Sequence, residues 1–259
     1  MLRRFSLARF SRGVGVALAL SVFAVACGTD TNPALDQPDP SAQQAFTPGD
    51  VSLDTVVVDG ISLEIAVIVP PGFSTGDSAP VLLALPPGGQ STSLVLSTMQ
   101  DIYLTQASER GWVVVSPAAP AGVKFFEGSE TLIPGLLDYV SSWVEPEGGK
   151  FHLAGISNGG ISSFRVATQN PHRFASVVVF PGFASSEADI SGLDVLAEIP
   201  VRLFVGGMDT AWIPRMQQTE QTLRGFGGDV LLETFPGEGH IIGALNDGIR
   251  VFDELDAAR

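Results

Sequence analysis

The chain has one cysteine, Cys27, among its 259 residues, so no disulfide bond can form within it. It has three histidines, and no group of His, Cys, Asp and Glu has the spacing of metal ligands. The sequence therefore predicts neither a structural disulfide nor a bound metal, and it contains no motif that calls for a cofactor.

Positive charge is scarce beyond the N-terminus. Lys124 and Lys150 are the only lysines, and the formal net charge of the chain is −14. A surface this acidic repels polyanions, so nucleic acids are excluded as substrates or partners. Neutral or weakly charged small molecules and polymers fit this surface better. The oligomeric state leaves no signature in the sequence.

A hydrophobic run long enough for a membrane span is also missing. The apolar run over residues 14–26 is shorter than the roughly 20 residues that a helix needs to cross a bilayer. Four arginines precede it, which is typical of a signal peptide over residues 1–26. Cys27 follows directly, in a stretch that resembles a bacterial lipobox, where the cysteine is lipidated and becomes the first residue of the mature protein.

The sequence thus predicts an exported protein that is held in the bacterial cell envelope by a lipid on Cys27, its only link to the membrane. Secretion as a soluble protein, after cleavage near Ala26, is the alternative. Residues 27–50 carry four prolines among polar side chains, cannot bury enough apolar surface to fold, and are predicted to be a flexible tether. Residues 51–259 then form one domain.

This domain alternates between strand-like and helix-like patterns. Two strands pair around Asp59-Gly60, a hairpin turn signal, and the later strands are separated by amphipathic segments. This order predicts the α/β class, with a mostly parallel eight-stranded sheet and helices on both faces. Residues 182–200 are too few for a large lid domain. The predicted strands are 51–58, 63–69, 81–85, 113–116, 151–156, 176–180, 201–205 and 230–235, and the predicted helices are 93–110, 132–144, 158–169, 213–226 and 241–255.

Ser157 lies in Gly155-Ile156-Ser157-Asn158-Gly159, between a strand-like and a helix-like segment. This is the G-x-S-x-G pattern of a nucleophile elbow, which presents the serine on a tight strand-to-helix turn. The glycines are needed because side chains there would collide with the neighbouring strand or helix. The pattern alone is weak in a chain with 29 glycines, but its position favours a nucleophile over an ordinary turn.

A serine nucleophile needs a base, and each of the three histidines has a different context. His152 lies within the strand before the elbow and is predicted to be a core or strand-edge residue. His172 follows Asn170-Pro171 and is predicted to lie in a solvated turn. His240 lies in a glycine-rich loop after the last predicted strand. This position gives the chain order Ser, acid, His that the pattern requires, so His240 is the predicted base.

The predicted acid is Asp209, in the turn that follows strand 201–205. Carboxylates at the ends of parallel strands face the ligand crevice, where Asp209 can accept the Nδ1 proton of His240. A helix N-cap before Ala211-Trp212 is a second, compatible role for Asp209. The fallback acids are Asp194, Asp189 and Glu238.

A serine that attacks a carbonyl carbon generates an oxyanion, which backbone N–H groups must stabilise. Asn158 offers one from the elbow, and the glycine-rich stretch after strand 81–85, Pro86-Pro87-Gly88-Gly89-Gln90, is placed to offer the second. Gly88 is the first candidate for this second donor and Gly89 is the other.

These motifs resemble those of the α/β-hydrolases over most of residues 51–259. The likeness is nearest to the compact esterases grouped with feruloyl esterases and polyhydroxybutyrate depolymerases, and to the phospholipase/carboxylesterase group. It implies the α/β-hydrolase fold and a serine esterase. The chain has Pro86-Pro87 where these families usually carry His-Gly. The stretches that carry the resemblance are 58–60 with 69–73, 85–90, 155–160 and 236–240.

The predicted function is that of a serine carboxylesterase acting on a small-molecule or polymer ester, with Ser157 as nucleophile, His240 as base and Asp209 as its partner. Thioesterases, polyester depolymerases and peptidases use the same groups. A non-catalytic surface lipoprotein that binds a ligand or partner is the alternative of a different class. Four aromatic residues could line an acyl or aryl pocket, although core packing is the commoner role for each: Phe125, Phe126, Phe183 and Trp212.

Overall fold

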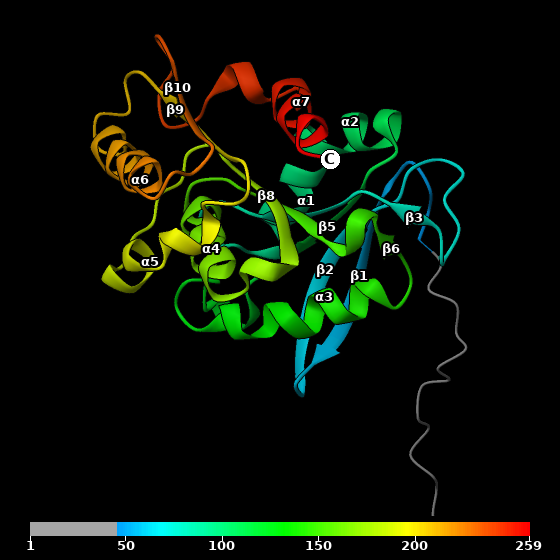
Figure 1. Cartoon of the computed structure of the whole chain (residues 1–259). Helices are drawn as coiled ribbons and strands as arrows, with labels where there is room; N and C mark the ends of the chain where they lie inside the picture. The colour runs from blue at the N-terminus through cyan, green and yellow to red at the C-terminus, as the bar shows by residue number, and fades with distance from the viewer. Residues whose placement is uncertain (1–45) are drawn as a thin grey trace, which may run out of the picture. The chain divides into compact units, whose positions relative to one another are not determined.

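A mostly parallel sheet of eight strands forms the centre of the domain (Figure 1). The computed structural model describes residues 46–259, so the predicted signal peptide, Cys27 and nearly all of the tether lie outside the described residues. The strands follow the order β1-β2-β5-β4-β7-β8-β9-β10, in which β2 runs antiparallel to both of its neighbours and all other neighbouring strands are parallel. Their bounds are β1 Val51–Val58, β2 Ile61–Ile68, β4 Val81–Leu85, β5 Val113–Pro117, β7 Phe151–Gly155, β8 Phe174–Val179, β9 Val201–Gly206 and β10 Val230–Phe235. The predicted fold class is confirmed.

Alternation along the strands explains why helices cover both faces. In β4, Val81, Leu83 and Leu85 belong to one hydrophobic core, whereas Leu82 and Ala84 belong to a second core. Successive side chains of a strand point to opposite faces, so a strand that is apolar throughout must be covered on both sides.

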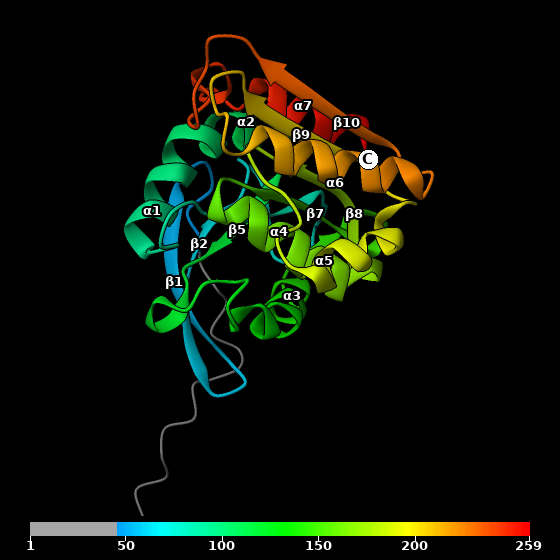
Figure 2. The same ribbon diagram turned by 90° about the vertical axis from the view of Figure 1, so that its left-hand side faces the viewer.

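Helices α3, α4 and α6 supply the first core, and α1, α2 and α7 supply the second (Figure 2). Phe164 of α4 and Leu223 of α6 are fully buried on the first side, and Phe252 of α7 is fully buried on the second. The helices are α1 Thr92–Thr98, α2 Leu104–Arg110, α3 Ile133–Ser141, α4 Asn158–Gln169, α5 Glu187–Ser191, α6 Ile213–Gly225 and α7 Ile249–Ala257.

Short elements connect these layers. A π-helical turn, η1 (Met99–Tyr103), joins α1 to α2, so the predicted helix 93–110 is one helical rod with a wider turn in its middle. Strands β3 and β6 pair in a separate two-stranded sheet. Their bounds are β3 Ser78–Ala79 and β6 Glu145–Pro146, and the 3-10 turns are η2 Pro120–Gly122, η3 Ser129–Leu132, η4 Glu147–Gly149, η5 Pro171–Arg173, η6 Leu193–Leu196 and η7 Gly243–Leu245.

Two predicted helices need correction. The helix expected over residues 241–255 is wrong in its first half, because the chain continues as a loop through η7 and α7 begins only after Gly248. Gly248 has φ 71°, a left-handed conformation that interrupts a right-handed helix. The helix expected over 132–144 ends at Ser141.

No large lid covers the sheet within residues 46–259, since only α5 and η6 lie between β8 and β9. None of the helices in this range is long and apolar enough to cross a membrane.

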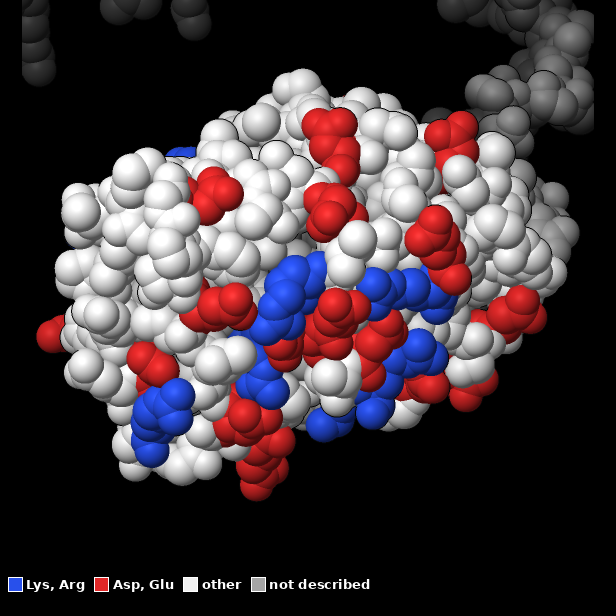
Figure 3. Space-filling model, turned by 90° about the horizontal axis from the view of Figure 1, so that it is seen from above, with Lys and Arg blue, Asp and Glu red and all other residues white. Residues whose placement is uncertain are grey.

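Arginine–carboxylate pairs fasten α7 to the rest of the domain. Arg110 of α2 lies 2.8 Å from Asp253 and 2.9 Å from Asp256, and Arg202 of β9 lies 2.8 Å from Glu254. Figure 3 shows Lys and Arg side chains interleaved with Asp and Glu on the face seen from above, where α7 lies in Figure 1. Such pairs are worth up to about 1 kcal/mol each, so the network positions α7 more than it stabilises the fold.

Candidate active site

Four loops meet at the carboxyl edge of the parallel strands. They follow β4, β7, β9 and β10, and these are the loops that carry the predicted oxyanion glycines, Ser157, Asp209 and His240. In an open α/β sheet, ligands bind outside the carboxyl ends of the strands, so this edge is where the fold itself predicts a site.

Ser157 occupies a strained turn between β7 and α4. Its φ of 56° and ψ of −116° are values that non-glycine residues rarely adopt, and its N–H donates to the carbonyl of Pro181 over 2.8 Å. A Cβ at Gly155 would collide with the carbonyl of Gly159, and a Cβ at Gly159 would collide with the carbonyl of Leu85 in β4. These contacts explain why both glycines of the pentapeptide are required for the strand and helix to meet at this angle.

Ser157, His240 and Asp209 form one hydrogen-bonded chain. The Ser157 Oγ lies 2.8 Å from Nε2 of His240, and the His240 Nδ1 lies 2.7 Å from Oδ2 of Asp209. A carboxylate can only accept, so Nδ1 carries the proton and donates to Asp209, which leaves Nε2 to accept from the Ser157 hydroxyl. The structure brings together the three residues that the sequence predicted.

The loops of Asp209 and His240 are tied to each other by backbone contacts. The N–H of Met208 donates to the carbonyl of Glu238 over 2.9 Å, and the N–H of Gly207 donates to Phe235 over 2.8 Å. The side chain of Asp209 is 8% exposed and does not cap a helix, because α6 begins four residues later with no side-chain cap. The N-cap role considered for this residue is therefore wrong.

The fallback acids serve other contacts. Glu238 Oε2 accepts the N–H of Gly243 within the loop of His240, and Asp194 is exposed in η6. Asp189 is buried in a capping box at the start of α5 and is paired with Arg165. Burial raises the pKa of Asp189, but hydrogen bonds from Arg165 and Ser186 outweigh that effect and hold the pKa below its usual value.

The other two histidines lie away from this chain of hydrogen bonds. His152 is buried in β7, where its Nδ1 lies 2.7 Å from Ser176 Oγ, and His172 is exposed in η5. Both positions agree with the sequence-based expectation.

The glycine-rich loop after β4 is held over the elbow by two amides. The Asn158 side chain donates to the carbonyl of Gly88 over 2.8 Å. Gln90 is fully buried, and its Nε2 donates to Pro86 O at 3.2 Å and to Ser162 Oγ at 2.9 Å, while its Oε1 accepts the N–H of Phe125. Gln90 is thus a site residue to which the sequence analysis gave no role, although a lone amide closing a Pro-Pro-Gly-Gly turn is a signal that could have indicated it.

The four predicted pocket aromatics lie behind the site. Trp212 contacts the His240 ring with centroids 4.7 Å apart, and Phe183 contacts Trp212 at 4.8 Å, so this pair supports the imidazole from one side. Phe125 is fully buried in the core, and Phe126 is partly buried against it. None of the four lines the cavity beside Ser157, since their rings are used in packing.

That cavity has a volume of about 380 Å³ and opens beside Ser157 and His240. Its walls are mostly aliphatic, and they are formed by Leu94, Ile102, Ile156, Phe180, Ile241 and Ile242.

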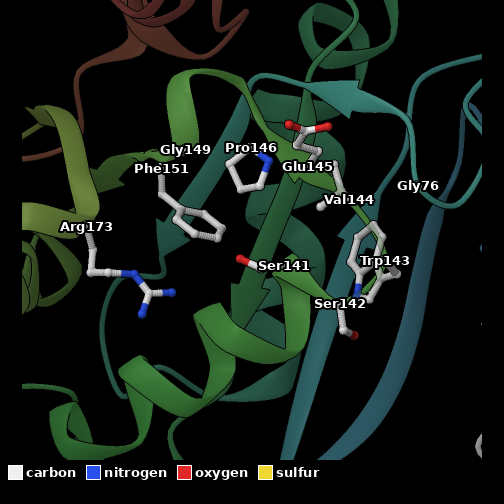
Figure 4. A pocket seen from close by; sticks show the side chains of 10 residues that line it. All are labelled: Gly76, Ser141, Ser142, Trp143, Val144, Glu145, Pro146, Gly149, Phe151 and Arg173. Carbon is white, nitrogen blue, oxygen red and sulfur yellow. The ribbon is translucent and has the colours of Figure 1, made fainter.

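A larger cavity, of about 510 Å³, lies at the opposite end of the sheet (Figure 4). Phe151 is the first residue of β7 and Arg173 directly precedes β8, so this cavity opens at the amino ends of the strands. Arg173 is already paired with Asp138 at 2.8 Å and lies over the ring of Phe151. The cavity beside Ser157 is therefore the better candidate for a substrate site, despite its smaller volume.

No group of His, Cys, Asp and Glu within residues 46–259 could hold a metal ion. Neither a protein-family model nor a curated protein matches this chain.

Solved structures do match it. A thermostable esterase superposes with a TM-score of 0.59 at 14% identity, over 72% of this chain and 55% of that one, so the chain spans about half of its length. An S-formylglutathione hydrolase from Agrobacterium tumefaciens gives 0.62 at 18% identity, over 80% and 93% of the two chains. A ferulic acid esterase gives 0.60 at 15% identity, over 81% and 97%. At these identities the likeness shows the fold, and the chain has the α/β-hydrolase fold that its motifs predicted.

Proposed function

We propose that this protein is a serine hydrolase, and specifically a carboxylesterase that acts on neutral esters. The observation that carries the proposal is the hydrogen-bonded chain from Ser157 through His240 to Asp209, at 2.8 and 2.7 Å, on the strained turn after β7. This arrangement is recognised by its geometry and roles on many unrelated folds. The solved structures of similar fold include two esterases and a hydrolase, which supports the same class of reaction.

In the first half-reaction, Ser157 Oγ attacks the carbonyl carbon of the ester while its proton passes to His240 Nε2. The imidazolium donates from Nδ1 to Asp209, whose negative charge stabilises it. The tetrahedral intermediate then collapses, the bond to the alcohol oxygen breaks, and the alcohol leaves with the proton from Nε2. An acyl group remains on Ser157.

In the second half-reaction, water attacks the acyl carbon and gives one proton to His240. The bond from this carbon to Ser157 Oγ breaks, the serine recovers its proton from Nε2, and the carboxylic acid is released. No reagent other than water is consumed.

We expect the oxyanion of both intermediates to accept from the backbone N–H of Asn158 and from that of Gly88 or Gly89. The hydrogen bond from Asn158 Nδ2 to Gly88 O supports this assignment, because it fixes the glycine loop relative to the elbow. The N–H of Asn158 is the first of helix α4 and has no acceptor within that helix.

The same groups would serve a thioesterase, a polyester depolymerase or a peptidase, and the charge of the chain supports neutral substrates for any of them. The supporting evidence for export is the signal-like run and Cys27, which suit an esterase that is lipid-anchored in the cell envelope. Secretion as a soluble enzyme is the alternative.

The experiment that tests the reaction compares wild type with Ser157→Ala on 4-nitrophenyl esters. We expect kcat to fall by on the order of 10³-fold or more, because only binding and oxyanion stabilisation remain. The change removes one partly exposed hydroxyl, so an unchanged melting curve is the control for folding. Hydrolysis within tenfold of wild type would show that Ser157 is not the nucleophile, and an inactive wild type would favour the non-catalytic binding protein.

A further inference from the structure

The cavity beside Ser157 is lined almost wholly by hydrocarbon. Leu94, Ile102, Ile156, Phe180, Ile241 and Ile242 form its apolar walls, and none of the described residues that line it is Asp, Glu, Lys or Arg. Thr98, 7% exposed, and Asn246 are its polar side chains apart from Ser157 and His240. A charged group that entered this cavity would lose its water without gaining a partner, which is costly.

One wall of the cavity is a single face of the helical rod that starts at α1. Leu94, Thr98 and Ile102 are spaced by four residues and so point to the same side. Ile102 lies within the π-helical turn η1, where the N–H of Leu104 donates to the carbonyl of Met99, five residues earlier. Such turns are rare and often occur at functional sites.

The opposite wall is the loop that follows His240. Ile241 is 79% exposed at the rim, and Ile242 is 4% exposed inside. The end of this loop touches the first wall, because a Cβ at Gly248 would collide with the carbonyl of Ile102. This close approach limits how near the two walls can come to each other at that end of the cavity.

This lining favours an uncharged, aliphatic occupant. Phe180 is the only aromatic side chain apart from His240 among the described residues of the lining, so an aryl group would gain few of the ring-to-ring contacts that stabilise aromatic pairs. Trp212 and Phe183, which could have stacked on an aryl group, pack behind His240 instead. The cavity also touches Ser157 and Gly88, the two positions that would hold the carbonyl carbon and the carbonyl oxygen of the ester.

We propose that this cavity binds the aliphatic acyl chain of the ester, and that Ile102 in the π-helical turn limits the length of that chain. The inference rests on the proposed esterase function and names its substrate class. We assign the cavity to the acyl chain because this chain stays bonded to Ser157 through both half-reactions and can benefit from the cavity in each, whereas the alcohol departs after the first.

The first test uses wild-type enzyme and one leaving group. We expect kcat/KM to rise from 4-nitrophenyl acetate to butyrate by about 15-fold, since two methylenes are added and each buried methylene is worth about fourfold, and then to fall once the chain outgrows the cavity. We expect 4-nitrophenyl ferulate to be hydrolysed at least about tenfold more slowly than butyrate. A faster reaction with ferulate than with butyrate would overturn the proposal. A chain-length effect in alkyl acetates, which vary the alcohol, without one in this acyl series would also overturn it.

The second test changes the wall. Ile102→Trp should lower the ratio of kcat/KM for hexanoate to that for acetate by at least about tenfold, and Ile102→Ala should shift the optimum to a longer chain. The matched control is Ile249→Trp, an exposed isoleucine on α7 that does not line the cavity, which should leave the profile unchanged. If the profile is the same in wild type and both Ile102 variants, the cavity does not select the acyl chain.

A fluorophosphonate probe distinguishes a failure of the inference about the cavity from a failure of the proposed function. Labelling of Ser157 without any chain-length preference would overturn only the inference about the cavity. The absence of both labelling and hydrolysis in wild type would overturn the proposed function and this inference with it.

Discussion

At the scale of single residues, His240 has a partner at each ring nitrogen and an aromatic contact on its ring. Asp209 accepts from Nδ1, Ser157 lies at Nε2, and Trp212 supports the ring face with centroids 4.7 Å apart. The first two partners could be predicted from the sequence, because residue type and chain order limit a nucleophile, its base and its acid to few candidates. The support by Trp212 and the amide contacts of Gln90 could not, since they depend on loops that meet only in the folded protein.

His152 gives the folded protein a pH dependence that is unrelated to the site. It is 3% exposed, and burial, together with the charge of Arg259, lowers its pKa from 6.5 to about 4. The unfolded chain therefore binds this proton more readily than the folded one. The contribution of His152 to the free energy of unfolding is fully present above about pH 6.5 and is lost as the pH falls toward 4. About 2 kcal/mol of this contribution is lost between pH 7 and pH 5.

Urea denaturation of wild type and His152→Gln at pH 7 and pH 5 measures this contribution. The difference between the two pH values should be smaller in the variant by about 2 kcal/mol. Carboxylates with lowered pKa values, such as Asp189, lose their contribution only below their ordinary pKa of 3.8 and do not interfere in this range. An equal loss of stability in both proteins would contradict the assignment.

At the scale of elements, strands were more predictable than helices. All eight strands of the main sheet fall within a few residues of the expected ranges, because a short apolar run between turn signals is too short for a buried helix. The helix expected to begin at Ile241 failed because its apolar residues line a cavity and a loop rather than a helix face. The π-helical turn at Met99–Tyr103 had no signal in the sequence, and its neighbour Gly248, which lies close to the carbonyl of Ile102, is distant along the chain.

The approach of α4 to β4 leads to a prediction about Gly159. Gly159→Ala should reduce the free energy of unfolding by about 1–3 kcal/mol and lower ester hydrolysis, because the new Cβ meets the backbone carbonyl of Leu85, which cannot rotate away. Urea denaturation and kcat/KM on a 4-nitrophenyl ester measure the two effects.

The matched control is Gly225→Ala, at the end of α6, where a Cβ would find nothing within 4 Å. That change should be neutral or slightly stabilising, since alanine is the better helix former. Equal effects of the two substitutions would mean that the close approach at the elbow does not restrict residue 159.

At the scale of the whole molecule, the N-terminal sequence is the basis for the proposed export. Removal of the proposed leader, which has four arginines and no acids, would take the formal charge from −14 to −18, so polyanions would be poor substrates for the processed chain. Most of the arginines that remain are engaged in pairs such as those that fasten α7.

The lipid anchor is tested by partitioning in Triton X-114. Wild type expressed in a bacterial host should enter the detergent phase and incorporate labelled palmitate, and Cys27→Ser should do neither, because Cys27 is the only cysteine. Ser157→Ala is the control, since it should partition like wild type. A wild-type protein that stays entirely in the aqueous phase would instead support soluble secretion.

The central claim is that Ser157 is the nucleophile of an ester hydrolase, and the mass of a covalent adduct tests it most directly. Purified wild type, treated with a fluorophosphonate until hydrolysis of a 4-nitrophenyl ester stops, should carry one phosphonate per chain on the peptide that contains Ser157. The remaining activity should fall in proportion to the labelled fraction. Full labelling with activity retained, or loss of activity with the phosphonate on another residue, would contradict the account.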